Sequence, residues 1–415
     1  MVVGSLREKC SAEEAQSRQR ERLLDPLEWR KGCSLQRPEV DFSLATKKYQ
    51  RSSAGKEFLP EEVRPPDICL ETMDFLIDSV LDADDAQDGL DGLFAVTPSL
   101  PQIYSYLHDR CRAVRMDLHL QQPWSSRTQE FVTCHEYCLR FEALSRFLFS
   151  QRLKTTNAQR GDAGATPSDH YDERLGLQAI SQTIDPLLAA YQQAREEGTP
   201  FENEPFVQRL VILLLLATSP DALPAHLAAL DRRLVGHPLV REAIEATGHF
   251  LSGHYVRFLR FAASDLWASL VLVDLADLAR VRLLWLRARA YHKAVGDRWP
   301  LKQLAKLLVC DAELLRHLLV TYKVEVVEEP EAEAVLPRKG AWEDHPLFCE
   351  FPQTAGPFAS HAHLWRSHRL SVARRRDAVK GLMDPTEHGE VPSDLQQQIS
   401  WAKAAFRLHE SIHQV

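Results

Sequence analysis

Two cysteines one helical turn apart have the residue types and spacing of half a metal site. Cys134 and Cys138 flank His135, so the run offers two thiols and an imidazole. A zinc site takes about four protein ligands, and no further set of ligands is evident near this run. We therefore expect buried helix cysteines here and no metal site.

The sequence carries none of the common catalytic motifs. His135 and Glu136 begin the HExxH pattern of zinc proteases, but Leu139 takes the place of the second histidine. There is no GxSxG nucleophile elbow, no phosphate-binding P-loop and no GxGxxG dinucleotide turn. We expect no catalytic residues, no cofactor and no enzymatic activity.

Basic side chains form two clusters with the character of a nucleic-acid contact. A long helix expected over 266–295 would bring Arg282, Arg289 and Lys293 within about 40° of one another around its axis. Basic residues in register can follow a phosphate backbone, so we expect weak, salt-sensitive and sequence-tolerant RNA binding. The alternative is a solvated face, or pairing with acids of neighbouring helices. The second cluster is the run Arg374, Arg375 and Arg376.

The composition excludes several classes of protein. Hydrophobic residues make up 45% and charged residues 26% of the 415, which is ordinary globular usage and rules out a mostly disordered chain. The formal charge of -8 argues against a protein built mainly to coat nucleic acid. Because no apolar run is long enough to span a bilayer or to direct secretion, we expect neither. The thinly spread cysteines, without CxxC pairs, indicate reduced thiols in the cytosol or nucleus.

Helical periodicity dominates most of the chain. Ser11 begins a capping-box pattern that opens a charged helix. The clearest helix has Ile103, Leu107 and Val114 along one apolar face. Repeated helix pairs follow as far as residue 295 and indicate an α-solenoid stack, although no fixed period identifies a named repeat.

The pattern changes near residue 299. A short helix over 299–308 and a second over 311–322 are followed by a strand at 324–327 and a return strand at 334–337. Two short helices and a hairpin are the components of a winged helix. We therefore predict an all-α, helical-repeat stack that ends in a small winged helix with a short β-hairpin.

The second helix of this winged helix is poorly suited to reading DNA. It begins with two acids, carries one Arg and no Asn or Gln, and is followed by an acidic wing. Its leucines span more than one helix face, so part of this apolar surface should stay exposed and meet a partner protein. The predicted partner contacts are Leu314, Leu315, Leu318 and Leu319.

An arginine-rich run lies within the clearest helix. At about 100° per residue, Arg110 falls inside the apolar stripe, whereas Arg112 and Arg115 point away from it. A buried guanidinium needs a carboxylate or several carbonyls as partners. The nearest candidates on the following helix are Glu136 and Glu142. We expect a structural ion pair for Arg110 and surface positions for the other two arginines.

Several sequence blocks, in order, resemble one known family. Residues 45–51 are similar to its Ala-x-Lys-Lys-Tyr-x-Arg segment, and residues 109–117 match its Asp-Arg-x-Arg-x-x-Arg-x-Asp signature. Across residues 44–338 the chain resembles the suppressor-of-actin-three/GANP (germinal-centre-associated nuclear protein) family. The residues of its signature blocks, for which the resemblance implies a structural role, are Asp109, Arg110, Arg112, Arg115, Asp117, Gln121, Glu202, Asn203 and Glu204.

The N-terminal block departs from the family pattern. The family usually begins this block with Cys-Pro-x-x-Glu-Arg, whereas Cys10 is followed here by Ser-Ala-Glu-Glu. Only Arg18, Leu27 and Glu28 retain part of the block, and Glu142 stands where many members carry His. These departures leave the expected fold intact and leave the role of the N-terminal block open.

The resemblance implies an architecture, partners and a cellular role. It implies a PCI-like helical stack whose winged helix pairs with a second PCI-type subunit, together with a small acidic subunit. It also implies a non-enzymatic scaffold of a nuclear mRNA export assembly of the TREX-two type, placed in the nucleus and at its envelope or pore. Two alternatives stay open: a cytosolic PCI subunit of proteasome-lid, signalosome or translation-initiation type, and a centrosome or spindle factor.

Four segments are expected along the chain. Residues 1–43 form a charged and partly disordered N-terminal segment, and residues 44–295 form the helical-repeat domain. Residues 296–340 form the winged helix. Residues 341–415 form a loop-rich, basic C-terminal extension with a terminal helix.

Overall fold

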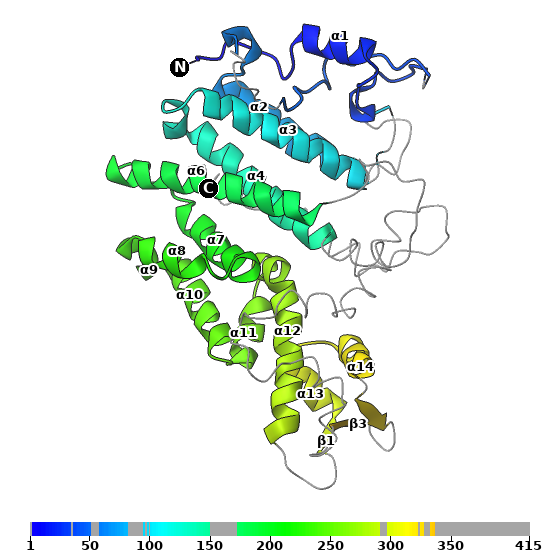
Figure 1. Cartoon of the computed structure of the whole chain (residues 1–415), viewed down its shortest axis with the longest axis vertical. Helices are drawn as coiled ribbons and strands as arrows, with labels where there is room; N and C mark the ends of the chain where they lie inside the picture. Colours follow the sequence, from blue (N-terminus) through cyan, green and yellow to red (C-terminus); the bar gives the residue numbers. More distant parts are fainter. Residues whose placement is uncertain are drawn as a thin grey trace. The chain divides into compact units, whose positions relative to one another are not determined.

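The chain divides into two compact units (Figure 1). In the described chain, the first unit contains residues 2–149 and 172–201, and the second contains residues 202–336. The contacts therefore show no boundary at residue 43, and they divide the expected domain over 44–295 near residue 202. The computed structural model describes residues 2–34, 36–50, 58–81, 94–95, 98, 100–149, 172–290, 297–322, 324–327 and 333–336. The expected C-terminal extension lies outside these ranges.

The first unit is a stack of helices. The apolar stripe predicted on α3 is confirmed, because Ile103, Leu107 and Val114 are all buried. Helix α4 packs against α2, α3 and α6, which explains why its side chains are buried around most of its circumference. The helices are α1 (Ala12–Arg20), α2 (Pro66–Phe75), α3 (Leu100–Leu120), α4 (Gln129–Phe149) and α6 (Glu173–Glu196). The short turns are η1 (Pro26–Glu28), η2 (Pro60–Glu62), the π-helical η3 (Leu76–Val80) and η4 (Ser125–Arg127).

The N-terminal segment is packed, which corrects the expectation of a partly disordered region for its described residues. Ser11 caps α1 as predicted, since its hydroxyl accepts a hydrogen bond from the Glu14 amide at 3.2 Å. Hydrophobic patterning did not predict this packing, because apolar residues are few here and buried ion pairs hold much of the segment in place. The small apolar cluster of the segment consists of Cys10, Ala15, Leu24, Val40 and Ala45, with Trp29 against it.

Gly4 lets the start of the chain lie directly against another backbone segment. A Cβ atom at this position would lie 2.5 Å from the carbonyl oxygen of Val63. The Gly4 amide donates to Gln121 Oε1 at 3.0 Å, and the Leu6 amide donates to Val63 O at 3.1 Å. The absence of a side chain is therefore required for this approach.

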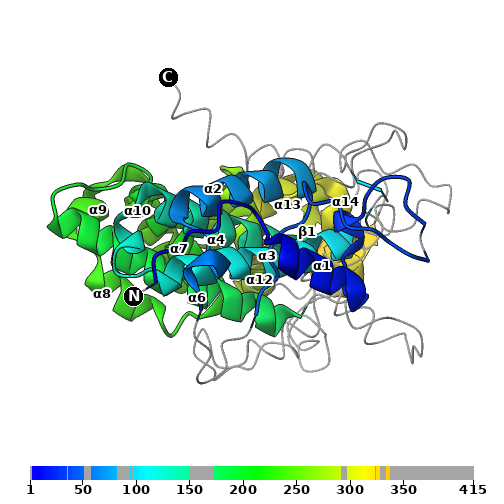
Figure 2. The ribbon, with the colours of Figure 1, turned by 90° about the horizontal axis from the view of Figure 1, so that it is seen from above.

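The second unit is organised around α7 (Glu204–Thr218). Its residues 210–214 are buried on all sides, as expected for a stretch of helix that is apolar around its whole circumference. Helix α7 packs against α8, α10 and α12, and α9 lies beside α10 (Figure 2). No helix in the described chain has the length and apolar character needed to cross a bilayer. The other helices are α8 (Leu223–Ala229), α9 (Arg232–Gly236), α10 (Pro238–Leu251), α11 (Tyr255–Ala262) and α12 (Leu266–Ala290).

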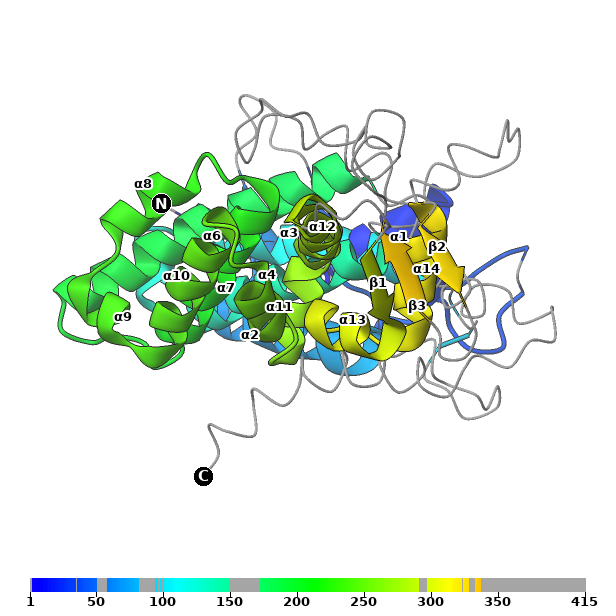
Figure 3. The same ribbon diagram turned by 90° about the horizontal axis from the view of Figure 1, so that it is seen from below.

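The described part of the second unit closes with two short helices and a three-stranded antiparallel sheet. The strands lie in the order β1-β3-β2 next to α13 and α14 (Figure 3). The predicted hairpin is present, with Val326 opposite Ala334. There is an additional edge strand, β1, whose last two residues, Trp299 and Pro300, were predicted to start a helix. Pro300 lacks an N–H and is tolerated at such an edge. The elements are β1 (Asp297–Pro300), α13 (Leu301–Leu308), α14 (Ala312–Thr321), β2 (Glu325–Val327) and β3 (Glu333–Leu336).

Candidate functional site

Arg110 on α3 is buried, as its place in the apolar stripe predicted. Its Nη2 donates to Glu28 Oε1 at 3.0 Å, and its Nη1 contacts the Asp109 carboxylate. The guanidinium also lies 4.4 Å from the centroid of the Tyr106 ring. Burial lowers the pKa of Arg110, but the neighbouring Tyr106, Glu28 and Asp109 outweigh it and raise the pKa above its ordinary value. Arg110 is therefore a charged structural residue.

Glu28 is the counterion of Arg110, and the expected partners on α4 are wrong. Glu136 instead accepts a hydrogen bond from the Tyr191 hydroxyl, and Glu142 Oε1 lies 2.7 Å from His108 Nδ1. Glu28 belongs to η1 in the N-terminal block, far from α3 in sequence. No periodicity links two such distant segments, so only the retained Glu of the N-terminal block could have suggested the pair.

Both oxygens of the Glu28 carboxylate are bound by other parts of the chain. The group is completely buried, and Arg18 binds its Oε2 while Arg110 binds its Oε1. The Thr46 amide donates to Oε1 at 3.0 Å and the Tyr106 hydroxyl donates to it at 3.2 Å. A buried charge is stable when it is paired and fully hydrogen-bonded. Glu28 therefore joins α1, the loop before Tyr49 and α3.

A second buried carboxylate, Asp117, forms a similar junction closer to the C-terminal end of α3 than Arg110. Lys47 Nζ lies 2.6 Å from Asp117 Oδ1, and Arg64 Nε lies 2.7 Å from Asp117 Oδ2. Gln121 donates to the Arg64 carbonyl at 2.9 Å while accepting from the Gly4 amide. The Asp and Gln of the signature thus hold residues from three separate N-terminal segments.

The two remaining arginines of the run lie in different surroundings. Arg112 is half-buried, with its guanidinium 4.0 Å from the centroid of the Tyr49 ring. Arg115 is buried and donates to Thr183 Oγ1 on α6 at 2.6 Å, which corrects the expectation of a surface position. The expectation failed because α3 is covered on its second side as well, and the projection of one helix does not show its neighbours.

The second signature block begins α7 and belongs to the second unit. Asn203 occupies the position before the first turn, and Glu202 is exposed just ahead of it. Glu204 is buried and accepts a hydrogen bond from Gln208 Nε2 at 3.2 Å. The signature residues thus fall into two groups, one in each unit.

Most of the leucines predicted to contact a partner are core residues. Leu315, Leu318 and Leu319 are completely buried, together with residues of α12 and α13, and Leu314 is partly buried beside them. This corrects the expectation that the set presents an exposed face. Helix α14 exposes Val320 instead, whose side chain is 72% accessible.

The predicted RNA-contacting stripe is described at one residue only. Arg282 on α12 donates to the Tyr255 hydroxyl at 3.0 Å, so its guanidinium has a partner on α11. The other members of the two predicted clusters lie outside the described side chains: Arg289, Lys293, Arg374, Arg375 and Arg376.

A different group of cations is exposed on the second unit. Arg257 and Arg260 lie on α11, and Lys302 and Lys306 lie on α13. We call these four residues the basic face. Sequence reasoning missed it, although both helices have basic residues at helical spacing and no acidic residue.

The cysteine-histidine run lies inside the first unit. Cys134, His135 and Cys138 are buried, and His135 Nδ1 donates to the Phe131 carbonyl at 2.8 Å. Burial lowers the pKa of His135 to about 3, so the ring is neutral. Within the described ranges, no group of three or more His, Cys, Asp or Glu side chains is placed to hold a metal ion.

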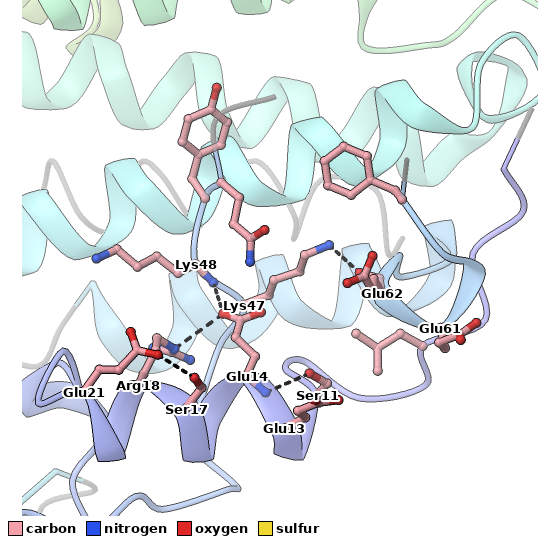
Figure 4. A pocket seen from close by; sticks show the side chains of 14 residues that line it. Ser11, Glu13, Glu14, Ser17, Arg18, Glu21, Lys47, Lys48, Glu61 and Glu62 are labelled. Atoms are coloured by element: carbon pink, nitrogen blue, oxygen red, sulfur yellow. Dashed lines mark hydrogen bonds and ion pairs between the residues drawn. The ribbon is translucent and has the colours of Figure 1, made fainter. Parts of the chain in front are cut away.

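A cavity of about 610 Å³ opens between α1 and the segments around Lys47 and η2 (Figure 4). Its two deepest cations are committed to other groups, because Arg18 binds Glu28 and Lys47 binds Asp117. Its serines cap or pair within α1, and no histidine lines it. The acidic residues that line it are Glu13, Glu14, Glu21, Glu61 and Glu62.

Comparison with known proteins gives one consistent result. The model of the SAC3/GANP family matches residues 9–328. The chain is 24% identical over 338 residues to SAC3 family protein B of Arabidopsis thaliana, covering 80% of this chain and 18% of that protein. It is 26% identical over 271 residues to Protein xmas of Drosophila melanogaster, covering 64% and 12%. It is 29% identical over 143 residues to SAC3 family protein 1 of Schizosaccharomyces pombe, covering 34% and 12%. The matched part spans less than a fifth of each relative.

Proposed function

The chain belongs to the SAC3/GANP family, and from this premise we propose that it is a non-enzymatic scaffold subunit of a nuclear mRNA export assembly of the TREX-two type. The observation that carries the proposal is that the residues of the family signature have partners within the chain. Its charged residues on α3 bind other parts of the same chain, so they stabilise a platform. Residues with such partners are suited to shape a rigid surface, and they are not available to a substrate.

The proposed partner is a second PCI-type subunit that binds the end of the second unit. Val320 is an exposed aliphatic side chain on α14, and Leu314 on the same helix is only partly buried. Exposed apolar side chains of this kind mark protein interfaces when they form part of a larger patch. A small acidic subunit and weak RNA contact through Arg282 and the basic clusters complete the proposed assembly.

Affinity purification followed by mass spectrometry tests this function. A tagged chain should recover a PCI-type partner and mRNA export components, and it should localise to the nucleus. Val320→Asp should reduce that recovery without changing the melting temperature. Val235→Asp is the matched control, because Val235 is also exposed, on α9 of the same unit.

Three results would contradict the proposal in different ways. Recovery of proteasome-lid, signalosome or ribosomal components would favour a cytosolic PCI subunit. Localisation to centrosomes or spindle poles through the cell cycle would favour a centrosome or spindle factor. Equal recovery with Val320→Asp and Val235→Asp would show that the partner binds elsewhere.

A further inference from the structure

The basic face is formed by two short helices that lie side by side, α11 and α13 (Figure 3). Arg257 and Arg260 are three positions apart, and Lys302 and Lys306 are four apart, so each pair shares one side of its helix. All four side chains are exposed. Neither helix contains an Asp or Glu. The face therefore presents positive charge on a chain whose net charge is -8.

The four cations are not used by the fold. None of them makes an ion pair or a side-chain hydrogen bond within the described chain, whereas nearby charged residues do. Arg209 binds Asp265, and Arg280 binds Asp277 and the last carbonyls of α13. The arginines around the basic face are thus paired within the second unit, whereas the four cations of the basic face can attract an external acidic group.

Partly accessible apolar side chains are next to these cations in sequence. Val256 and Phe261 on α11, and Leu307 on α13, are partly buried and contribute some accessible surface. The guanidinium of Arg209 lies 5.4 Å from the centroid of the Phe261 ring, so one side of this ring is already covered. Single-stranded nucleic acid gains much of its affinity from bases stacked on aromatic rings. A surface of cations and aliphatic groups fits an acidic polypeptide better.

We propose that the basic face is a docking surface for an acidic amphipathic segment of a partner protein. Carboxylates of the segment pair with Arg257, Arg260, Lys302 and Lys306, and its apolar side chains contact the partly accessible apolar side chains of α11 and α13. Complementary charge of this kind raises the association rate and selects among partners. This surface goes beyond the contact proposed at Val320, and its test does not depend on that contact.

Binding of a defined probe to the full chain tests the surface. The probe is a short fluorescein-labelled peptide with Glu on one side of the helix and Leu on the other, followed by fluorescence anisotropy at low ionic strength. We expect saturable binding that weakens as salt is added, because exposed charge pairs are screened. The quadruple variant R257E/R260E/K302E/K306E should bind at least about tenfold more weakly, because four attractive contacts become repulsive.

Matched controls separate the proposal from nonspecific attraction. R232E/R233E reverses two exposed arginines on α9 of the same unit and should bind as the wild type does. A peptide with Ser in place of Leu should bind more weakly. The double variants R257E/R260E and K302E/K306E replace the quadruple variant if its melting temperature falls.

Three outcomes would overturn the assignment. Equal weakening by R232E/R233E would mean that only overall charge matters. Equal affinity for the Ser peptide would remove the apolar part of the surface. Tighter binding of an oligouridylate that displaces the peptide would identify the basic face as a nucleic-acid surface.

Discussion

Glu28 shows how one buried charge can tie together segments that are distant in sequence. Its carboxylate binds guanidinium groups from α1 and α3 and also accepts from Thr46 and Tyr106. Breaking such a pair is costly, because the charge that remains is buried without compensation. The arginines of the signature therefore differ in importance according to their surroundings, although their side chains are identical.

Arg110→Ala should destabilise the first unit much more than Arg112→Ala. Removing Arg110 leaves Glu28 with less compensation in the interior and should cost about 3–5 kcal/mol of unfolding free energy. Arg112 is half-buried and loses mainly its contact with the Tyr49 ring, worth about 0.5–1 kcal/mol. Urea unfolding midpoints of the two variants measure the difference. Equal midpoints would contradict the structural role of Arg110.

His135 should make stability fall at mildly acidic pH. Its pKa is lowered from 6.5 to about 3 by burial, so below pH 6.5 the unfolded chain binds a proton that the folded chain does not. Stability is therefore full above 6.5 and is lost as pH falls toward 3. The difference in unfolding free energy between the wild type and His135→Leu should change by about 1.4 kcal/mol per pH unit between about pH 6 and 4. Parallel curves would show that His135 becomes protonated in the folded state.

At the scale of helices and strands, the sequence was sufficient wherever one element determines its own packing. The stripe on α3 and the cap at Ser11 follow from spacing alone, and both are present. Prediction failed where burial depends on a second element: Arg115 is covered by α6. Leu318 and Leu319 are covered by their own unit. A helical projection shows on which side of its helix a residue lies, but it does not show which element packs against that side.

Gly4→Ala should loosen the contact between the start of the chain and the segment after η2. The added Cβ would meet the Val63 carbonyl at 2.5 Å, so the backbone must shift, at a cost of about 1–3 kcal/mol. Gly248→Ala on α10 is the control, because nothing lies within 4 Å of a Cβ there. Thermal melting should show a lower midpoint for the first variant only. A lower midpoint for both would point to a general sensitivity of the chain to alanine.

For the whole molecule, most of the chain's helical architecture could be predicted, but its division into units could not. The sequence indicated a single helical domain after a loose N-terminal segment. The contacts instead separate the chain near residue 202 and include the N-terminal segment in the first unit. That segment has few apolar residues, so hydrophobic patterning did not detect it. Its attachment depends on charges such as Glu28, whose partner Arg110 lies in α3.

Deleting residues 1–43 should therefore destabilise the first unit, although the sequence suggested a partly disordered segment. The deletion removes Glu28 and leaves Arg110 with only the Asp109 carboxylate beside it, and breaking a buried pair in this way costs about 3–5 kcal/mol. Adding Arg110→Met to the deletion should restore part of the loss, because it removes the uncompensated charge. Thermal unfolding of the three chains measures this. A truncated chain that melts like the full chain would contradict the anchoring role of the segment.

The junction around Glu28 also has an evolutionary consequence. A change at Glu28 alone strands the guanidinium groups of Arg18 and Arg110, whereas a joint change to apolar residues of similar volume is tolerated in such triads. Substitutions at these three positions should therefore be inherited together, with apolar residues appearing as a set in related chains. The N-terminal block and the signature helix would then evolve together, despite the distance between them along the polypeptide.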